Sequence, residues 1–428
     1  MKAALVVALA CAACGTAPAA VSPSAGAERT ASSALPAPQV QPARYLRSLE
    51  FEPNAYGVQR DVVATDLLLG DLLFHSPYTL GQRAQSLGMS CNTCHPNGAT
   101  HNELFIEGVS NRPGNVDLSS RFFRPAADDG VANALNIPSL RGCRYTGPYG
   151  RDGRTASLAE FVQGVAHAEF DGSLLSEDEL GALLRYVQDL DFLPNSLLDA
   201  RNGLTPRASD AARRGAIAFA ADRPGFGGMS CATCHPASTF FRDGRVHRLG
   251  SGRSPSPHAV DGAYETPSLL GLAETAPYFH DGRFANLRDV VRWFDESFDL
   301  KLEPQEFDDL VAYVEAVGAV DRPRDTRPLA MRLDQVFAYV TLLPSASARV
   351  RTMVVEAIEK ELAAAPSPLR ERVKSLAESL RQLAEQAPSN QSRKASETLR
   401  HELSRLAADW AGSLAPEIVQ SKTTVLLP

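Results

Sequence analysis

The octapeptide MSCNTCHP at residues Met89–Pro96 has a near copy in MSCATCHP at residues Met229–Pro236. Two thiols separated by two residues can form thioether bonds to the two vinyl groups of one porphyrin, and the histidine that follows can then bind the iron. The repeated spacing therefore predicts two covalently bound c-type haems. The predicted haem-binding residues are Cys91, Cys94 and His95 in the first copy and Cys231, Cys234 and His235 in the second.

Two other uses of this cysteine spacing fit the sequence less well. A thioredoxin-like redox site needs a βαβ context, which neither copy has. A zinc site would need four cysteines in one cluster, which requires the two copies to meet in space. The doubling of the motif behind an export signal favours haem, because covalent haem attachment in bacteria is completed outside the cytoplasm.

The N-terminus predicts export. Lys2 precedes the short apolar run AALVVALACAACGT, which is typical of a secretory signal and too short to span a bilayer. We place the signal at residues 1–14, with either plain cleavage after small residues or lipidation at Cys11 or Cys14. Residues 15–43 are rich in Ala, Pro and Ser and predict a disordered tether. The expected location is the periplasm, with membrane attachment only through such a lipid anchor.

The composition is that of a globular protein. Of the 428 residues, 44% are apolar and 22% are charged. The formal net charge of −7 argues against a nucleic-acid partner, since such proteins usually carry a basic surface.

The repeat extends beyond the octapeptides, with four elements in the same order in both halves. A short helical segment with a central glycine precedes each octapeptide. A longer segment, IPSLRGCRYTGPYGRDGRTASLAEFV at Ile137–Val162, follows the first, and TPSLLGLAETAPYFHDGRFANLRDVV at Thr266–Val291 follows the second. Each half then ends with an amphipathic helical pattern that has acidic residues at its start.

This organisation predicts an all-α protein with two tandem cytochrome c-like haem domains and a C-terminal helical extension. The domains are placed at residues 44–198 and 199–322, and the extension at 327–428. The extension holds three amphipathic helical patterns without cysteine. Its expected role is packing on the haem-binding core, with docking of a partner as the second possibility.

The paired PSLxGxxxTxPYxxDGR segments and the two haem motifs resemble the bacterial di-haem cytochrome c peroxidases and their MauG-type relatives over roughly residues 60 to 320. The resemblance implies a peroxidatic N-terminal haem and a C-terminal haem that relays electrons. It implies hydrogen peroxide as substrate, with a small electron-donor protein or an oxidisable protein substrate as partner, and it leaves room for calcium between the domains. A di-haem electron carrier without peroxidase activity, and a maturation enzyme for one dedicated protein, are the alternatives.

The resemblance also implies site residues. His95 and His235 match the proximal ligands, and Glu169 matches the distal acid of the N-terminal haem, with Asp171 as second choice and a solvated helix position as the alternative for Glu169. Arg154 and Arg283 end the two Asp-Gly-Arg turns, where they could bind haem propionates or pair locally with the neighbouring aspartate.

The sequence departs from the family at three positions. Arg151 stands where the family often has a tryptophan between the haems. Phe294 stands where peroxidases place an axial methionine and MauG-type relatives a tyrosine. Asn111 stands where some peroxidases place a histidine that closes the N-terminal haem, and its presence favours an open haem.

Further expectations concern three histidines and one cysteine. His247 and His258 are candidates for the sixth ligand of the second haem, against the default of a surface loop. His280 is expected to hydrogen-bond near a propionate rather than bind iron. Cys143 aligns with Leu272 in the repeat and is expected to be a buried structural thiol.

Overall fold

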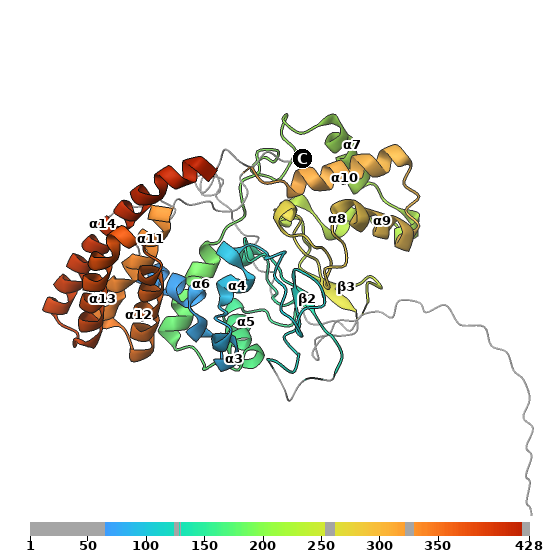
Figure 1. The fold of residues 1–428 in the computed structure, drawn as a ribbon. Coiled ribbons are helices and arrows are strands. Elements are labelled where there is room, and N and C mark those ends of the chain that lie inside the picture. The colour runs from blue at the N-terminus through green and yellow to red at the C-terminus, as the bar shows by residue number, and fades with distance from the viewer. Residues whose placement is uncertain (1–64, 124–127, 129, 253–261, 322–328, 422–428) are drawn as a thin grey trace, which may run out of the picture. The chain divides into compact units, whose positions relative to one another are not determined.

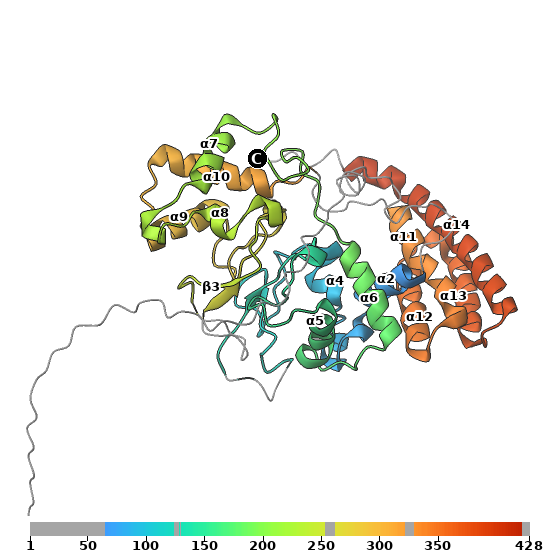
Figure 2. The same cartoon turned by 180° about the vertical axis from the view of Figure 1, so that it is seen from behind.

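The computed structural model describes residues 65–123, 128, 130–252, 262–321 and 329–421, with side chains described only up to residue 414 in the last range. The signal and tether predicted at 1–43 therefore lie outside the described residues. The described chain is mostly helical, as the sequence predicts, with two short antiparallel strand pairs, β1 (Asn115–Val116) with β2 (Leu135–Asn136) and β3 (Val246–Arg248) with β4 (Ala263–Glu265). Figures 1 and 2 show the elements from two sides.

The first haem motif is preceded by helix α2 (Thr65–His75) and followed at a distance by helix α6 (Glu177–Asp189). The two helices pack closely because Gly70 has no side chain, and a Cβ at this position would collide with the carbonyl of Ala182. Helix α6 starts at a capping box, in which the Ser176 and Glu179 side chains accept hydrogen bonds from each other's backbone amides.

The second half repeats this arrangement with helices α7 (Asp210–Ala220) and α10 (Pro304–Gly318). Gly215, which aligns with Gly70 in the sequence repeat, lies where a Cβ would collide with the carbonyl of Asp309. The aligned glycines thus serve the same purpose, which is the close approach of the helices on either side of each haem motif.

The Asp-Gly-Arg turns of the two halves also share their backbone geometry. Tyr149 pairs with Thr155 in the first turn, and Tyr278 pairs with Phe284 in the second. Each tyrosine hydroxyl donates to the carbonyl six residues earlier, over 3.2 Å from Tyr149 and 2.9 Å from Tyr278. The repeat in the sequence is therefore a repeat in local structure as well.

The shorter helical elements position the two haem motifs and their loops. Their bounds are α3 (Gln82–Ser86), α4 (Cys91–Cys94), η2 (Pro96–Gly98), η3 (Cys143–Tyr145), α5 (Leu158–Gly164), the π-turn η4 (Val165–Glu169), η5 (Pro224–Phe226), α8 (Cys231–Cys234), η6 (Ala237–Thr239), η7 (Leu272–Glu274) and α9 (Leu287–Phe298).

The C-terminal segment forms helices α11 (Leu329–Ala338), α12 (Ala348–Ala363), α13 (Arg370–Glu385) and α14 (Asn390–Ser421), with the 3₁₀ segment η8 (Tyr339–Ser345) after α11. Their apolar faces share one hydrophobic core with α2 and α6. Figure 2 shows α2 beside α11 and α12. Fully buried members include Leu73 of α2, Phe337 of α11 and Val354 of α12. Cys143 belongs to this core and is 8% exposed, which confirms the expected buried thiol.

A buried carboxylate joins α2 to these C-terminal helices. Asp71 is 1% exposed and accepts hydrogen bonds of 2.7 Å from both Gln335 and Tyr339, while His75 lies 3.2 Å from its other oxygen. Burial alone would raise the pKa of Asp71, but the charge of His75 and the three hydrogen-bond donors outweigh burial and lower it.

This pKa shift predicts an acid sensitivity that depends on Asp71. A carboxyl whose pKa is lower in the native state stabilises the fold above its unfolded value of 3.8, and this stabilisation is lost as the pH falls through the native pKa. We expect Asp71→Asn to lower the free energy of unfolding by about 1–3 kcal/mol at neutral pH, and this deficit should vanish at the acid end of the pH range. Urea unfolding at a series of pH values measures it.

Asp66→Asn is the matched control, because Asp66 lies on the same helix but is 58% exposed in its side chain and pairs with Arg185 over 3.4 Å. Exposed pairs of this kind contribute little. A deficit for Asp71→Asn that does not change with pH, or one equal to that of Asp66→Asn, would contradict the prediction.

None of the helices in the described part of the chain is both long and apolar enough to cross a membrane.

Candidate haem-binding sites

Each Cys-x-x-Cys segment forms a single helical turn, α4 in the first half and α8 in the second. A serine before each turn and a threonine within it form a capping box, Ser90 with Thr93 and Ser230 with Thr233. Residues three apart lie on the same face of a helix, so both thiols of each turn point to one side. The five cysteines of the described residues are free thiols, as thioether formation with a porphyrin requires.

The histidine that follows each turn is held through one ring nitrogen. Nδ1 of His95 lies 2.9 Å from the carbonyl oxygen of Pro138, and Nδ1 of His235 lies 2.7 Å from that of Phe241. An imidazole that donates Nδ1–H to a carbonyl presents Nε2 as the lone-pair nitrogen, which is the usual arrangement for metal-binding histidines. The residues present therefore fit an axial histidine ligand at both sites.

Both imidazoles lie in surroundings that disfavour their charged form. Burial lowers the pKa of His95 to about 4, with a contribution from the positive charge of Arg151, and burial also lowers the pKa of His235. The neutral imidazole is the form that binds a metal. Burial raises the pKa of the Cys91 and Cys94 thiols to about 12 and that of Cys231 to about 11.

The first haem motif lies against an apolar cluster distinct from the core shared with the C-terminal helices. Cys91 and Cys94 pack on this cluster, which draws residues from α3, from strand β1 and from the loops around them. Its buried members are Leu80, Ala84, Met89, Val109, Val116, Phe123, Ile137 and Phe170. Such a lining is what a porphyrin face requires.

Glu169, the predicted distal acid, is the last residue of the π-turn η4, directly before Phe170 of this cluster. Its carboxylate lies 2.8 Å from the guanidinium of Arg154, and its side chain is 23% exposed. π-Turns of this kind often mark functional positions. Asp171, the second choice, is exposed with a positive φ of 55°. The structure thus places Glu169, and not Asp171, as a half-buried carboxylate beside the cluster.

The two arginines predicted to bind propionates are both paired within their own turns. Arg154 lies 3.1 Å from Asp152 as well as beside Glu169, and Arg283 lies 2.9 Å from Asp281. These contacts are the local ion pairs that the sequence left open as the alternative. A role of Arg154 and Arg283 in haem binding stays a prediction.

Phe294 stands at the position where the resemblance implies an axial ligand of the second haem, and it belongs to an aromatic cluster. The ring of Phe294, on α9, lies 5.0 Å from Trp293, 5.9 Å from Phe298 and 6.2 Å from Phe279, measured between centroids. Asn111 accepts a hydrogen bond from Asn115 in the first half. Neither the phenyl ring nor an amide engaged in this way offers iron the ligand that the family has at these positions.

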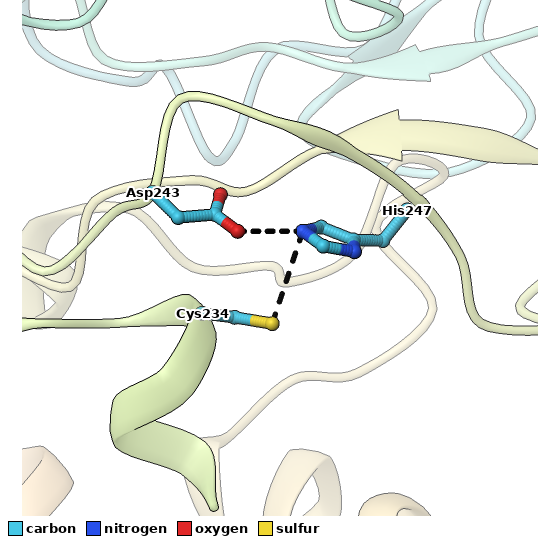
Figure 3. Close-up of side chains that lie close together, drawn as sticks. All are labelled: Cys234, Asp243 and His247. Carbon is cyan, nitrogen blue, oxygen red and sulfur yellow. Dashed lines mark hydrogen bonds and ion pairs between the residues drawn. The ribbon is translucent and has the colours of Figure 1, made fainter. Parts of the chain in front are cut away.

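His247 lies beside the second haem motif, as Figure 3 shows. Its Nε2 is 2.7 Å from Asp243 and 3.8 Å from Sγ of Cys234. The three side chains are close enough to one another to bind a metal ion. Because Cys234 belongs to the second attachment motif, however, the cluster does not form an independent metal site.

The remaining two histidines named from the sequence are His258 and His280. His258 lies outside the described residues. His280 is 7% exposed and stacks on Tyr264 with a centroid distance of 4.2 Å. The carbonyl acceptors of Pro138 and Phe241 could not be predicted, because backbone groups leave no side-chain signal. Asp243 was not among the predicted site residues.

Comparisons with known proteins bear on these sites. Residues 225–368 match the family model for di-haem cytochrome c peroxidase. The methylamine utilization protein MauG of Methylorubrum extorquens is 33% identical over 132 residues, which are 26% of this chain and 35% of that protein. The matched parts of the chain are thus similar to the di-haem cytochrome c peroxidases and to MauG. The resemblance that the sequence suggested is therefore confirmed.

Other similarities are more distant. Hydrazine synthase subunit gamma of Kuenenia stuttgartiensis is 24% identical over 242 residues, which are 44% of this chain and 66% of that protein. The chain thus spans less than two thirds of both of these curated relatives. The solved structure of the diheme peroxidase BthA of Burkholderia thailandensis has 19% identity and a TM-score of 0.41, over 59% of this chain and 85% of that one.

Proposed function

We propose that this protein is a di-haem c-type peroxidase in which hydrogen peroxide is reduced at the first haem and the second haem relays electrons. The observation that carries the proposal is the paired site geometry, in which each Cys-x-x-Cys turn is followed by a histidine held through Nδ1 by a backbone carbonyl. Two such sites in one chain of this family support two haems, in two tandem cytochrome c-like domains.

The net reaction consumes two electrons and two protons for each hydrogen peroxide and releases two molecules of water. The haem irons, when bound, would supply the electrons and the site at which the O–O bond breaks. The chain supplies the proton transfer, and Glu169 is the proposed acid and base for it. Its pairing with Arg154 fixes the carboxylate at the edge of the apolar cluster that packs on Cys91 and Cys94.

An electron carrier with both irons six-coordinate is the alternative function. Phe294 and Asn111 favour the peroxidase, because the positions at which the family supplies further ligands hold residues that do not bind iron here. We expect electron paramagnetic resonance of the isolated ferric protein to show a high-spin haem, and stoichiometric peroxide to abolish that signal. Two low-spin haems without reaction toward peroxide or cyanide would identify a carrier.

The partners and location follow from the same proposal. A small donor protein would return electrons to the second haem, or a residue on a protein substrate would be oxidised in its place. We propose the periplasm as the location, with a lipid anchor at Cys11 or Cys14 as the means of membrane attachment. We also propose a calcium ion bound between the domains.

A further inference from the structure

Arg151, which stands at the family's tryptophan position, lies where the two halves meet. Its guanidinium donates to the carbonyl of Asn136. The Asn136 amide in turn donates to the carbonyl of Pro277 over 2.5 Å, and the carbonyl of Arg151 accepts from the backbone of Glu265 over 2.8 Å. Arg151 is thus fixed by contacts with both halves of the chain.

Arg151 is connected to the first haem site through the backbone. Its guanidinium donates to the carbonyl of Asn136, two residues before Pro138, whose carbonyl oxygen lies 2.9 Å from Nδ1 of His95. The Arg151 side chain is half-buried. Burial lowers the pKa of Arg151 itself to about 10, partly offset by Tyr264 and Asp281. The group therefore stays charged at neutral pH in surroundings that disfavour its charge.

Four other arginines in these segments have carboxylate partners. Arg144 pairs with Asp191, Arg154 with Asp152 and Glu169, Arg242 with Glu265, and Arg283 with Asp281. In the described part of the chain, no carboxylate is close enough to Arg151 to form an ion pair, and Asp281 is already held by Arg283. A cation in such a place is costly unless an anion compensates it.

We propose that Arg151 binds a carboxylate of the first haem, and that this carboxylate supplies the counter-charge that the protein does not. The inference rests on the proposed function in that it requires a haem at Cys91 and Cys94. A guanidinium suits this role because it can donate two parallel hydrogen bonds to one carboxylate. Its positive charge next to the first haem would also favour the ferrous state, which carries one positive charge less than the ferric state.

The test measures the reduction potentials of both haems by spectroelectrochemical titration of the holoprotein. We expect Arg151→Gln to shift the reduction equilibrium of the first haem about tenfold toward the ferric state, equivalent to about 59 mV for one electron. Arg151→Lys should keep most of the wild-type potential. Both replacements can donate to the Asn136 carbonyl, but only lysine keeps the charge, so a merely structural role would affect the two variants alike.

Arg144→Gln is the matched control, because Arg144 is neutralised by Asp191 and should leave the potential of the first haem near that of the wild type. Equal shifts in Arg151→Gln and Arg151→Lys, or a shift in Arg154→Gln but not in Arg151→Gln, would overturn the inference. If Arg151→Gln does not retain haem, the test uses Arg151→Lys. The haem carboxylate bending band in the resonance Raman spectrum of this variant should shift relative to the wild type, and an unchanged band would contradict the assignment of Arg151.

These outcomes separate the inference from the function on which it rests. If the wild-type protein does not carry two haems, the proposed function is refuted. If it carries two haems and reacts with peroxide, but the reduction potential of the first haem does not depend on the charge of residue 151, only the role of Arg151 is refuted.

Discussion

Replacement of Cys91 and Cys94 by serine should remove one of the two haems and all reaction with peroxide. The two thiols are the attachment points of the proposed peroxidatic haem, and a serine hydroxyl cannot form the thioether bond. The second site lies on a different turn with its own histidine, so its haem should remain. Haem content per chain by pyridine haemochrome assay, together with peroxide consumption, measures both effects.

Cys143→Ser is the matched control for this pair. Cys143 is a buried free thiol that donates to the carbonyl of Val187 over 3.4 Å and belongs to the core shared with the C-terminal helices. Its replacement should cost some stability but leave two haems. A double variant that still binds two haems, or a Cys143→Ser protein that loses one, would contradict the assignment of the attachment residues.

Glu169→Gln should slow the reaction with peroxide by a factor of about 10² to 10⁴ while both haems and their ferric spectra remain. Glutamine has the shape of glutamate but cannot take up and release a proton at this position. The rate of change of the haem spectrum after mixing with peroxide, measured by stopped flow, reports the effect directly.

Glu160→Gln is the control, because Glu160 lies nearby on α5 but is exposed. Its rate should match that of the unmodified protein. The role of Glu169 would be refuted by a Glu169→Gln protein that reacts at the wild-type rate. A loss of rate in Asp171→Asn instead would transfer the role to the second candidate.

Much of the helical framework could be predicted because its signals are local. Gly70 and Gly215 align in the sequence, and each allows the same close approach between helices. The attachment turns follow in the same way from the spacing of their cysteines. What the sequence could not predict were contacts made by backbone groups. His95 uses the carbonyl of Pro138, but His235 uses that of Phe241, although Pro267 is the residue that aligns with Pro138.

The sequence also did not show which element each apolar helix face of the C-terminal segment packs against. The amphipathic patterns of the C-terminal segment indicate helices but not where they pack. In the structure, Phe337 and Val354 enter the same core as Leu73 of α2. Deletion of residues from Arg327 onward would therefore expose the buried face of α2 near the first haem motif. Loss of activity after such a deletion would thus report damage to this core as well as loss of any partner contact.

The haem content of the full-length wild-type protein tests the central claim most directly. We would express the chain in a bacterial host with a cytochrome c maturation system and determine its intact mass and its iron content. The account predicts the mass of the processed polypeptide plus two covalently bound haems, with two irons per chain. A chain that carries no haem, or only one, after expression in such a host would contradict it.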